Sequence, residues 1–279
     1  MKRSYVCALL GVVFCAVIIG CSRQSQEPHS ASLGSIRIEH IPERGYSGNG
    51  NALIVARLEA PLEKESLQVV LHYMKEKTWL SEGMSIEKAS VLHAEIPRQT
   101  IGSSVPYYFH LTTADGRQLL LPKDAPEESF QITFKGTVPR GLLFTHIVLM
   151  FGTILFLVIA TVFGVRVLLN KETVGRCLLV TSLAVAVFFI GGFPFGMIVE
   201  KMVFGSWWEG WPFGRDVTDT KTFVLFIYWI FVLFGMKGSL RGKSLELNFF
   251  KEKTFCRLVI IGSIITILIY LIPHQNIKF

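Results

Sequence analysis

The chain contains none of the short motifs that mark common catalytic or nucleotide-binding sites. It has no GxSxG, no HExxH and no dinucleotide-binding fingerprint. It also has no CxxC pair, which sets aside thiol–disulfide exchange and the usual zinc sites. We therefore predict no catalytic residues and no metal site, and we favour a protein without enzymatic activity.

Cysteine is also missing from the middle of the chain. No cysteine lies between Cys21 and Cys177, so a domain in this region must be held together by packing alone. The net charge of +7 does not indicate nucleic-acid binding. Acids and bases nearly cancel between residues 22 and 140, and the basic excess lies further along, at the ends of apolar segments.

Apolar residues are abundant, at 51% of the chain, and they concentrate after residue 140. Four runs predict transmembrane helices because each, with its flanking residues, is long enough to cross a bilayer. The runs are Leu142 to Val165, Leu178 to Val199, Phe223 to Met236 and Leu258 to Pro273.

The N-terminus has the organisation of a bacterial export signal. Met1-Lys2-Arg3 is charged, residues 5–19 are apolar, and Ile18-Ile19-Gly20-Cys21 closes the segment. This ending resembles the lipobox of bacterial lipoproteins. The resemblance implies cleavage before Cys21, acylation of its thiol and attachment to a membrane surface. Residues 1–20 are then a signal peptide and residues 21–33 a tether.

Residues 34–137 alternate apolar and polar side chains in about seven short runs, which predicts strands. Val69, Leu71 and Tyr73 share one face of a run, and Asp115-Gly116 predicts a tight hairpin. Seven strands in about 100 residues resemble an immunoglobulin-like β-sandwich of the kind common in bacterial surface proteins. The runs are Ser35 to Pro42, Ala52 to Ala60, Leu67 to Met74, Ser90 to Pro97, Val105 to Thr113, Arg117 to Pro122 and Ser129 to Lys135.

Aromatic and histidine residues of this region have ordinary explanations. We expect Trp79 and the tyrosines to lie in the core. His72, His93 and His110 lie on separate predicted strands, which permits a shared metal site, but strand histidines usually occupy polar faces.

The predicted fold is thus an all-β sandwich followed by an all-α domain of about four transmembrane helices at 141–279. The loops at 166–176 and 237–257 together carry nine basic and three acidic residues. By the positive-inside rule these loops are cytoplasmic, so residues 21–140 and the C-terminus lie outside the cytoplasmic (inner) membrane. Helical spans favour this membrane because outer membranes hold β-barrels.

Two pairs of small residues, each spaced four positions apart on one helix, predict close helix packing. They are Ala160 with Gly164 and Gly192 with Gly196. Pro194 lies between Gly192 and Gly196, and we expect it to kink its helix because it lacks an N–H group.

The stretch from Glu200 to Thr222 is unusually aromatic and is predicted to lie outside. It suits an interfacial loop in which Asp219 or Thr220 caps the next helix. Alternatively, it is a site for a cation, a quinol headgroup or a partner subunit. The candidate contact residues are Trp207, Trp208, Trp211, Arg215, Asp216 and Asp219.

His146 and His274 are predicted to lie near the same membrane level. If their helices are neighbours, the pair fits the axial ligands of a b-type haem, with Met150 as another possible ligand. Both histidines are shallow, and the predicted spans hold almost no internal charge.

Three functions remain open. The first is a non-enzymatic envelope protein, in which the sandwich binds a protein partner and the helices anchor it in the lipid bilayer or dock it onto a larger membrane complex. The second is an electron-transfer subunit that binds haem b or quinol near the outer face. The third and weakest is a transporter or channel component, because no ion path is visible.

Overall fold

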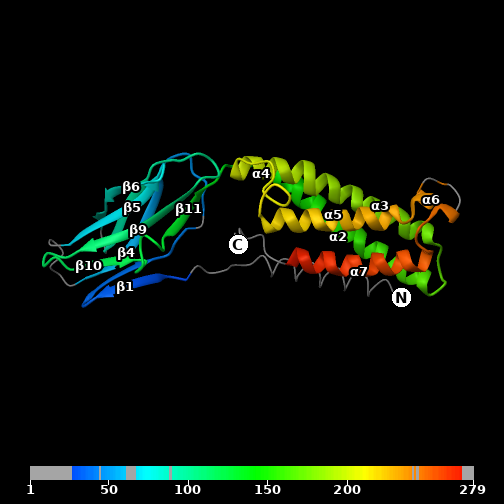
Figure 1. Cartoon of the computed structure of the whole chain (residues 1–279), viewed down its shortest axis with the longest axis horizontal. Coiled ribbons are helices and arrows are strands. Elements are labelled where there is room, and N and C mark those ends of the chain that lie inside the picture. The colour runs from blue at the N-terminus through cyan, green and yellow to red at the C-terminus, as the bar shows by residue number, and fades with distance from the viewer. Residues whose placement is uncertain are drawn as a thin grey trace. The chain divides into compact units, whose positions relative to one another are not determined.

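A computed structural model of the chain describes residues 27–43, 45–60, 67–87, 90–240, 242 and 245–271. The predicted signal peptide, Cys21 and His274 lie outside these residues. The chain divides into a β unit, within Gln24–Thr137 and Met202–Gly205, and a helical unit, within Val138–Lys201 and Ser206–Phe279. Both are visible in Figure 1.

The β unit consists of two sheets. One has the strand order β1-β2-β4-β8-β7, and the other has the order β3-β11-β9-β5-β6 with β10 also paired to β9. All pairings are antiparallel except that of β3 with β11. The strands of the first sheet are β1 (His29–Leu33), β2 (Ile36–His40), β4 (Ala52–Glu59), β8 (Val91–Ile96) and β7 (Ser85–Glu87), and those of the second are β3 (Gly45–Tyr46), β11 (Phe130–Phe134), β9 (Ser104–Thr112), β5 (Gln68–Lys75), β6 (Thr78–Gly83) and β10 (Gln118–Leu121).

Each of the seven predicted strands is present, and the predicted alternation is confirmed. Val69, Leu71 and Tyr73 are buried in β5. The hairpin at Asp115-Gly116 joins β9 to β10, and Gly116 has φ +83°, which favours glycine. The strand β1 begins within the segment assigned to the tether, because Ala31 contributes a buried side chain to the core.

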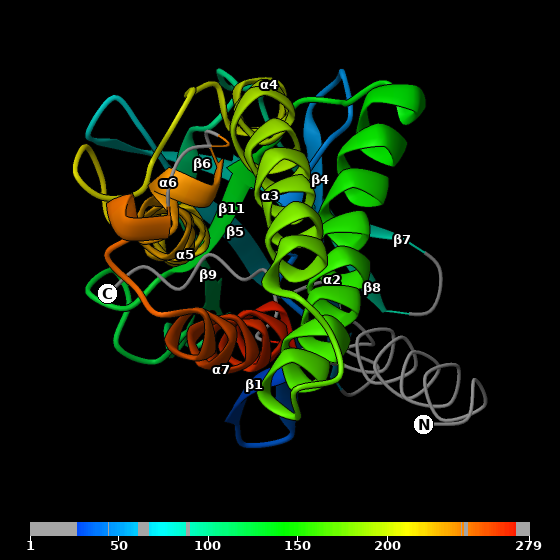
Figure 2. The same ribbon diagram turned by 90° about the vertical axis from the view of Figure 1, so that its right-hand side faces the viewer.

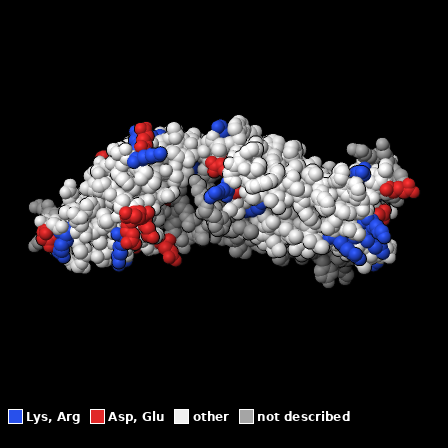
Figure 3. All heavy atoms as spheres, viewed as in Figure 1, with Lys and Arg blue, Asp and Glu red and all other residues white. Residues whose placement is uncertain are grey.

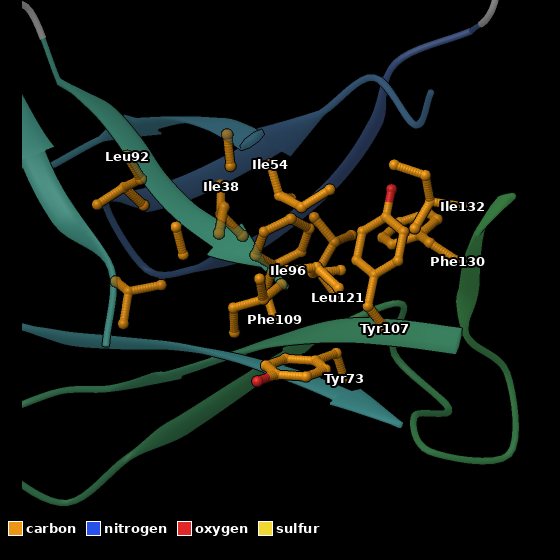
Figure 4. Packing of buried hydrophobic residues seen from close by; sticks show 14 of the residues in the cluster. Ile38, Ile54, Tyr73, Leu92, Ile96, Tyr107, Phe109, Leu121, Phe130 and Ile132 are labelled. Atoms are coloured by element: carbon orange, nitrogen blue, oxygen red, sulfur yellow. The ribbon is translucent and has the colours of Figure 1, made fainter. Parts of the chain in front are cut away.

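The core of the β unit lies between the two sheets and contains side chains from both (Figure 4). Tyr107 and Phe109 of β9 and Ile38 of β2 are almost completely buried there. The expectation that Trp79 lies in this core is wrong. Trp79 pairs with Met74 across β5 and β6, and this register turns it to the outer face, as it does Tyr108 of β9.

Four helices of the second unit are long and apolar enough to cross a membrane, as predicted. Viewed end on, α2, α3, α5 and α7 surround a common interior (Figure 2). The spans are α2 (Arg140–Leu168), the continuous segment of α3 (Val174–Ile190), η2 (Gly191–Phe195) and α4 (Gly196–Phe204), then α5 (Val217–Phe234) and α7 (Glu252–Leu271). Short elements α6 (Lys237–Leu240) and η3 (Leu245–Leu247) lie between α5 and α7.

Pro194 lies within a π-helical turn, η2, rather than in a regular α-helix. Proline cannot donate to the preceding turn, and the wider turn accommodates the missing hydrogen bond. The glycines of this turn lie where other helices pass closely. A Cβ atom on Gly191 would lie 2.8 Å from Cβ of Leu149 on α2, and one on Gly192 would lie 3.2 Å from Cγ2 of Thr222 on α5.

The small residues Ala160 and Gly164 lie where α2 approaches α3 and α7. The Cys177 thiol of α3 donates to the carbonyl of Ala160 over 3.5 Å. A Cβ on Gly164 would lie 3.5 Å from the carbonyl oxygen of Cys256 on α7. Small residues on α2 therefore allow both neighbouring backbones to come close.

Candidate functional site

The loop at residues 205–216 joins α4 to α5 and contains most of the candidate contact residues. Asp216, and not Asp219 or Thr220, is the N-cap of α5, so the predicted cap was wrong. The carboxylate of Asp216 accepts a hydrogen bond from the Asp219 N–H over 2.9 Å. Asp216 takes this role because its extended backbone places the side chain over the first turn.

The side chains of the first turn of α5 hold the loop backbone. Oδ2 of Asp219 accepts from the Glu209 N–H over 2.9 Å, and Oγ1 of Thr220 accepts from the Trp211 N–H, also over 2.9 Å. Glu209 in turn accepts from the Ser206 hydroxyl over 2.7 Å. The acidic residues of the loop therefore have structural partners, and no group of three potential metal ligands occurs among the described residues.

Two glycines allow the loop to fold back on itself and on α5. A Cβ on Gly210 would lie 2.6 Å from the backbone nitrogen of Thr220, and one on Gly214 would overlap the carbonyl oxygen of Glu209. Neither position has room for a larger residue. The Gly-Trp-Pro-Phe-Gly sequence thus specifies one compact loop.

Aromatic stacking attaches the same loop to the helices. The Trp208 ring stacks on Phe193 of η2, with centroids 5.6 Å apart and planes 10° apart. The Trp211 ring packs against Phe223 of α5, with the ring centroids 5.7 Å apart.

The loop nevertheless leaves three large apolar side chains exposed. Trp207 is 54% exposed, Trp211 58% and Phe213 86%. Arg215 is also exposed. We call these four residues the aromatic tip. The sequence did not identify Phe213 as a contact residue or Glu209 and Phe193 as supporting residues, and it indicated Thr220 only as a possible helix cap. The proline and glycine on either side of Phe213 were the only signal that it lies at a turn.

His146 and Met150 of α2 lie against η2 and α7. Nδ1 of His146 donates to the carbonyl oxygen of Gly191 over 3.0 Å. The Tyr270 hydroxyl donates to the Met150 sulfur over 3.7 Å. Both residues are therefore half-buried against neighbouring helices, each with a polar contact inside the protein, whereas His274 lies outside the described residues.

The interior of the described bundle contains hydroxyl groups but no fully buried charged side chain. The buried polar residues are Thr153, Thr181, Ser263 and Thr266. The Trp229 indole donates to Oγ1 of Thr266 over 3.1 Å, and the other three hydroxyls donate to the carbonyl four residues earlier in their own helices. Three of these hydrogen bonds lie within single helices, and the fourth joins α5 to α7.

Comparison with known proteins gives no family assignment, since no family model and no curated protein matches the chain.

Proposed function

We propose that this chain is a non-enzymatic protein of the bacterial cytoplasmic membrane, with an extracytoplasmic immunoglobulin-like module on a four-helix anchor. In this proposal it is an accessory subunit that docks onto a larger membrane complex. The aromatic tip is the observation that carries the proposal. Its backbone is held by hydrogen bonds and close glycine contacts, yet Trp207, Trp211 and Phe213 remain exposed. Rigid exposed aromatic residues beside an arginine are typical of contact sites.

The bundle interior supports an anchoring role rather than transport. Its fully buried polar residues carry hydroxyl groups with partners inside the protein, and the one shielded hydroxyl without a partner among the described residues of the bundle is that of Thr161. Transport pathways usually require ionisable side chains that face the interior or a water-filled cavity. The lipid-facing sides fit an anchor as well, because the visible face of the bundle in Figure 3 carries its charged residues toward the ends.

The strand order supports the immunoglobulin-like part of the proposal. In that fold, sheet ABED packs on sheet CFG. Strands β2-β4-β8-β7 follow the first order, and β5-β9 followed by β11 or β10 follows the second. The strand β6 adds to the edge beside β5, as an additional strand does in many such domains.

The proposed orientation depends on charge and on the lipobox. Arg166 and Arg176 lie at one end of the bundle, where both contact Glu172, at 3.8 and 3.2 Å. A net basic end is expected in the cytoplasm. If Cys21 is acylated, the full-length protein will carry a lipid mass that Cys21→Ala removes, and the parent mass without a lipid would contradict the lipoprotein part alone.

A photo-crosslinking experiment tests docking. A benzophenone amino acid replaces Phe213 in one variant and Leu179 in another, which is a matched control because Leu179 is 61% exposed on the side of α3. We expect position 213 to form a defined protein adduct in native membranes and position 179 to form only lipid adducts. The yield of the adduct at position 213 should decrease when Trp207→Ala or Arg215→Ala is introduced as well. Lipid adducts alone at both positions would contradict docking through the aromatic tip.

A second candidate, electron transfer, has one observation in its favour. Because Nδ1 of His146 donates to a carbonyl, Nε2 of this ring carries the lone pair that a haem iron requires. An absorption spectrum of protein produced with ample haem, oxidised and then reduced, tests this candidate. A Soret band that His146→Ala abolishes would favour it over docking, and a featureless spectrum would remove haem.

A further inference from the structure

Two histidines on the outer face of the β unit have ring nitrogens without a hydrogen-bond partner. His72 lies on β5 and His110 on β9, in adjacent strands. His72 pairs with Tyr108, and His110 pairs with Val70, so the two histidines are diagonal neighbours on the same face. In both rings Nε2 is shielded from solvent and has no partner. Such atoms are uncommon in folded proteins because each loses its hydrogen bonds to water.

Neighbouring side chains hold the His72 ring in place. Tyr108 stacks on it, with centroids 4.7 Å and planes 12° apart. Trp79 in turn packs edge to face against Tyr108, with the two ring centroids 4.9 Å apart. Oγ of Ser81 lies 3.0 Å from Nδ1 of His72. When Nδ1 donates to this hydroxyl, Nε2 has no proton and carries a lone pair.

We propose that His72 and His110 bind one divalent metal ion of the imidazole-preferring class, Cu²⁺ or Zn²⁺, through their Nε2 atoms. The ring centroids are 5.7 Å apart, with planes inclined by 34°. Two imidazoles that bind one ion at about 2 Å per bond and a near-tetrahedral angle have centroids roughly 5 to 6 Å apart. Diagonal placement on adjacent strands therefore gives the spacing that a shared ion requires.

The environment of His72 agrees with metal binding. Burial, and secondly the neighbouring His110, lower the pKa of His72. A lower pKa favours the neutral imidazole, which is the form that binds a metal ion. The hydroxyl of Ser81 acts as an outer partner that orients the ring, as such groups do in known metal sites.

His93, the third histidine on the predicted strands, lies elsewhere. His93 is on β8, in the other sheet, where it pairs with Val55 and Ser85. The described residues contain no cluster of three histidine, cysteine or acidic ligands. The proposed site thus has two protein ligands, and water or a donor from another molecule completes the coordination. Cu²⁺ should bind more tightly than Zn²⁺, following the usual order for nitrogen ligands.

The test uses the full chain in detergent, stripped with a chelator and titrated with Cu²⁺ against a competing chelator. The variants are His72→Gln, His110→Gln and, as a matched control, His93→Gln. Electron paramagnetic resonance detects nitrogen ligands, and quenching of Trp79 fluorescence reports binding nearby. The Trp79→Phe variant identifies the part of the quenching that arises from this residue.

We expect one Cu²⁺ site whose spectrum shows nitrogen coupling. His72→Gln and His110→Gln should each weaken binding by at least roughly tenfold, and His93→Gln should bind as the parent does. Ser81→Ala, which leaves both ligands in place, should weaken binding by a smaller factor and serves if a histidine variant fails to fold. Equal binding by the parent and all histidine variants, or no binding by the parent, would overturn the proposal. Docking through the aromatic tip is a separate contact, so failure of one proposal leaves the other unchanged.

Discussion

The Tyr107 hydroxyl donates a hydrogen bond of 2.8 Å to Nε2 of His40 in the core of the β unit. On the opposite side of the ring, Nδ1 of His40 donates to the carbonyl oxygen of Val55 over 2.7 Å. These two bonds fix the neutral tautomer. Burial, with a smaller contribution from His29, lowers the pKa of His40 from 6.5 to about 4.

The His40 ring predicts a pH-dependent stability of the β unit. His40 binds a proton near pH 6.5 in the unfolded chain but only near pH 4 in the folded chain. Its contribution to the free energy of unfolding is therefore fully present above pH 6.5 and is lost as the pH decreases toward 4. A shift of this size corresponds to about 3 kcal/mol. Hydrogen exchange of β9 amides in the full chain, corrected for intrinsic rates, measures the loss. His40→Gln should be less stable at pH 7 but should lack most of this slope; an unchanged slope would assign the effect to another group.

The aromatic loop predicts a strong dependence on two glycines. Gly210→Ala and Gly214→Ala should each destabilise the loop by about 1–3 kcal/mol, because the added methyl group meets backbone atoms. Fluorescence of the loop tryptophans and protease cleavage near residue 210 measure the change. Gly175→Ala is the control, since a Cβ there meets nothing within 4 Å. If all three variants resist protease equally, the loop is less tightly packed than described.

Helix contacts around Gly164 predict a graded response to side-chain size. Gly164→Ala should be tolerated, because the nearest atoms to its new Cβ lie at 3.5 to 3.6 Å, an ordinary contact distance. Gly164→Leu should separate α2 from α7 and cost about 1–3 kcal/mol. The thermal midpoint in detergent measures both, with Gly175→Leu as the control. Equal midpoints for the leucine variants would show that α2 and α7 do not depend on this contact.

The turn between β5 and β6 predicts a stabilising substitution. Glu76 and Lys77 have φ values of +51° and +67°, a region that glycine and asparagine adopt at lower cost. Lys77→Gly should therefore stabilise the β unit by roughly 0.5–1 kcal/mol. Gly116→Ala, at φ +83° with open space around it, should have the opposite sign. Hydrogen exchange of β5 amides compares the two variants, and a loss of protection in Lys77→Gly would contradict the turn conformation.

Much of the architecture follows from local patterns in the sequence. Alternation with period two predicted the buried face of β5, and long apolar runs predicted the four spans, because both signals involve neighbouring residues. Four short strands, β1, β3, β6 and β7, were missed. The strand β6, for example, contains Leu80 on an exposed edge and has little alternation, so its pairing with β5 was needed to define it.

The candidate site was predictable in composition but not in arrangement. The cluster of Trp207, Trp208 and Trp211 identified the loop, yet the sequence did not distinguish the packed Trp208 from the exposed Trp207. It also placed the helix cap on the wrong residue, because Asp216, Asp219 and Thr220 are all capable acceptors. Only the fold assigns Asp216 to the helix and the other two to the loop backbone.

The sequence by itself determined the order of a β-rich part and four apolar helices, since periodicity and hydrophobic length act along the chain. Tertiary structure alone decided which distant residues meet. The register of β5 on β9 brought His72 next to His110, while β8 carried His93 to the other sheet. Strand order and helix packing set these contacts through the burial of the whole core, which no single segment encodes.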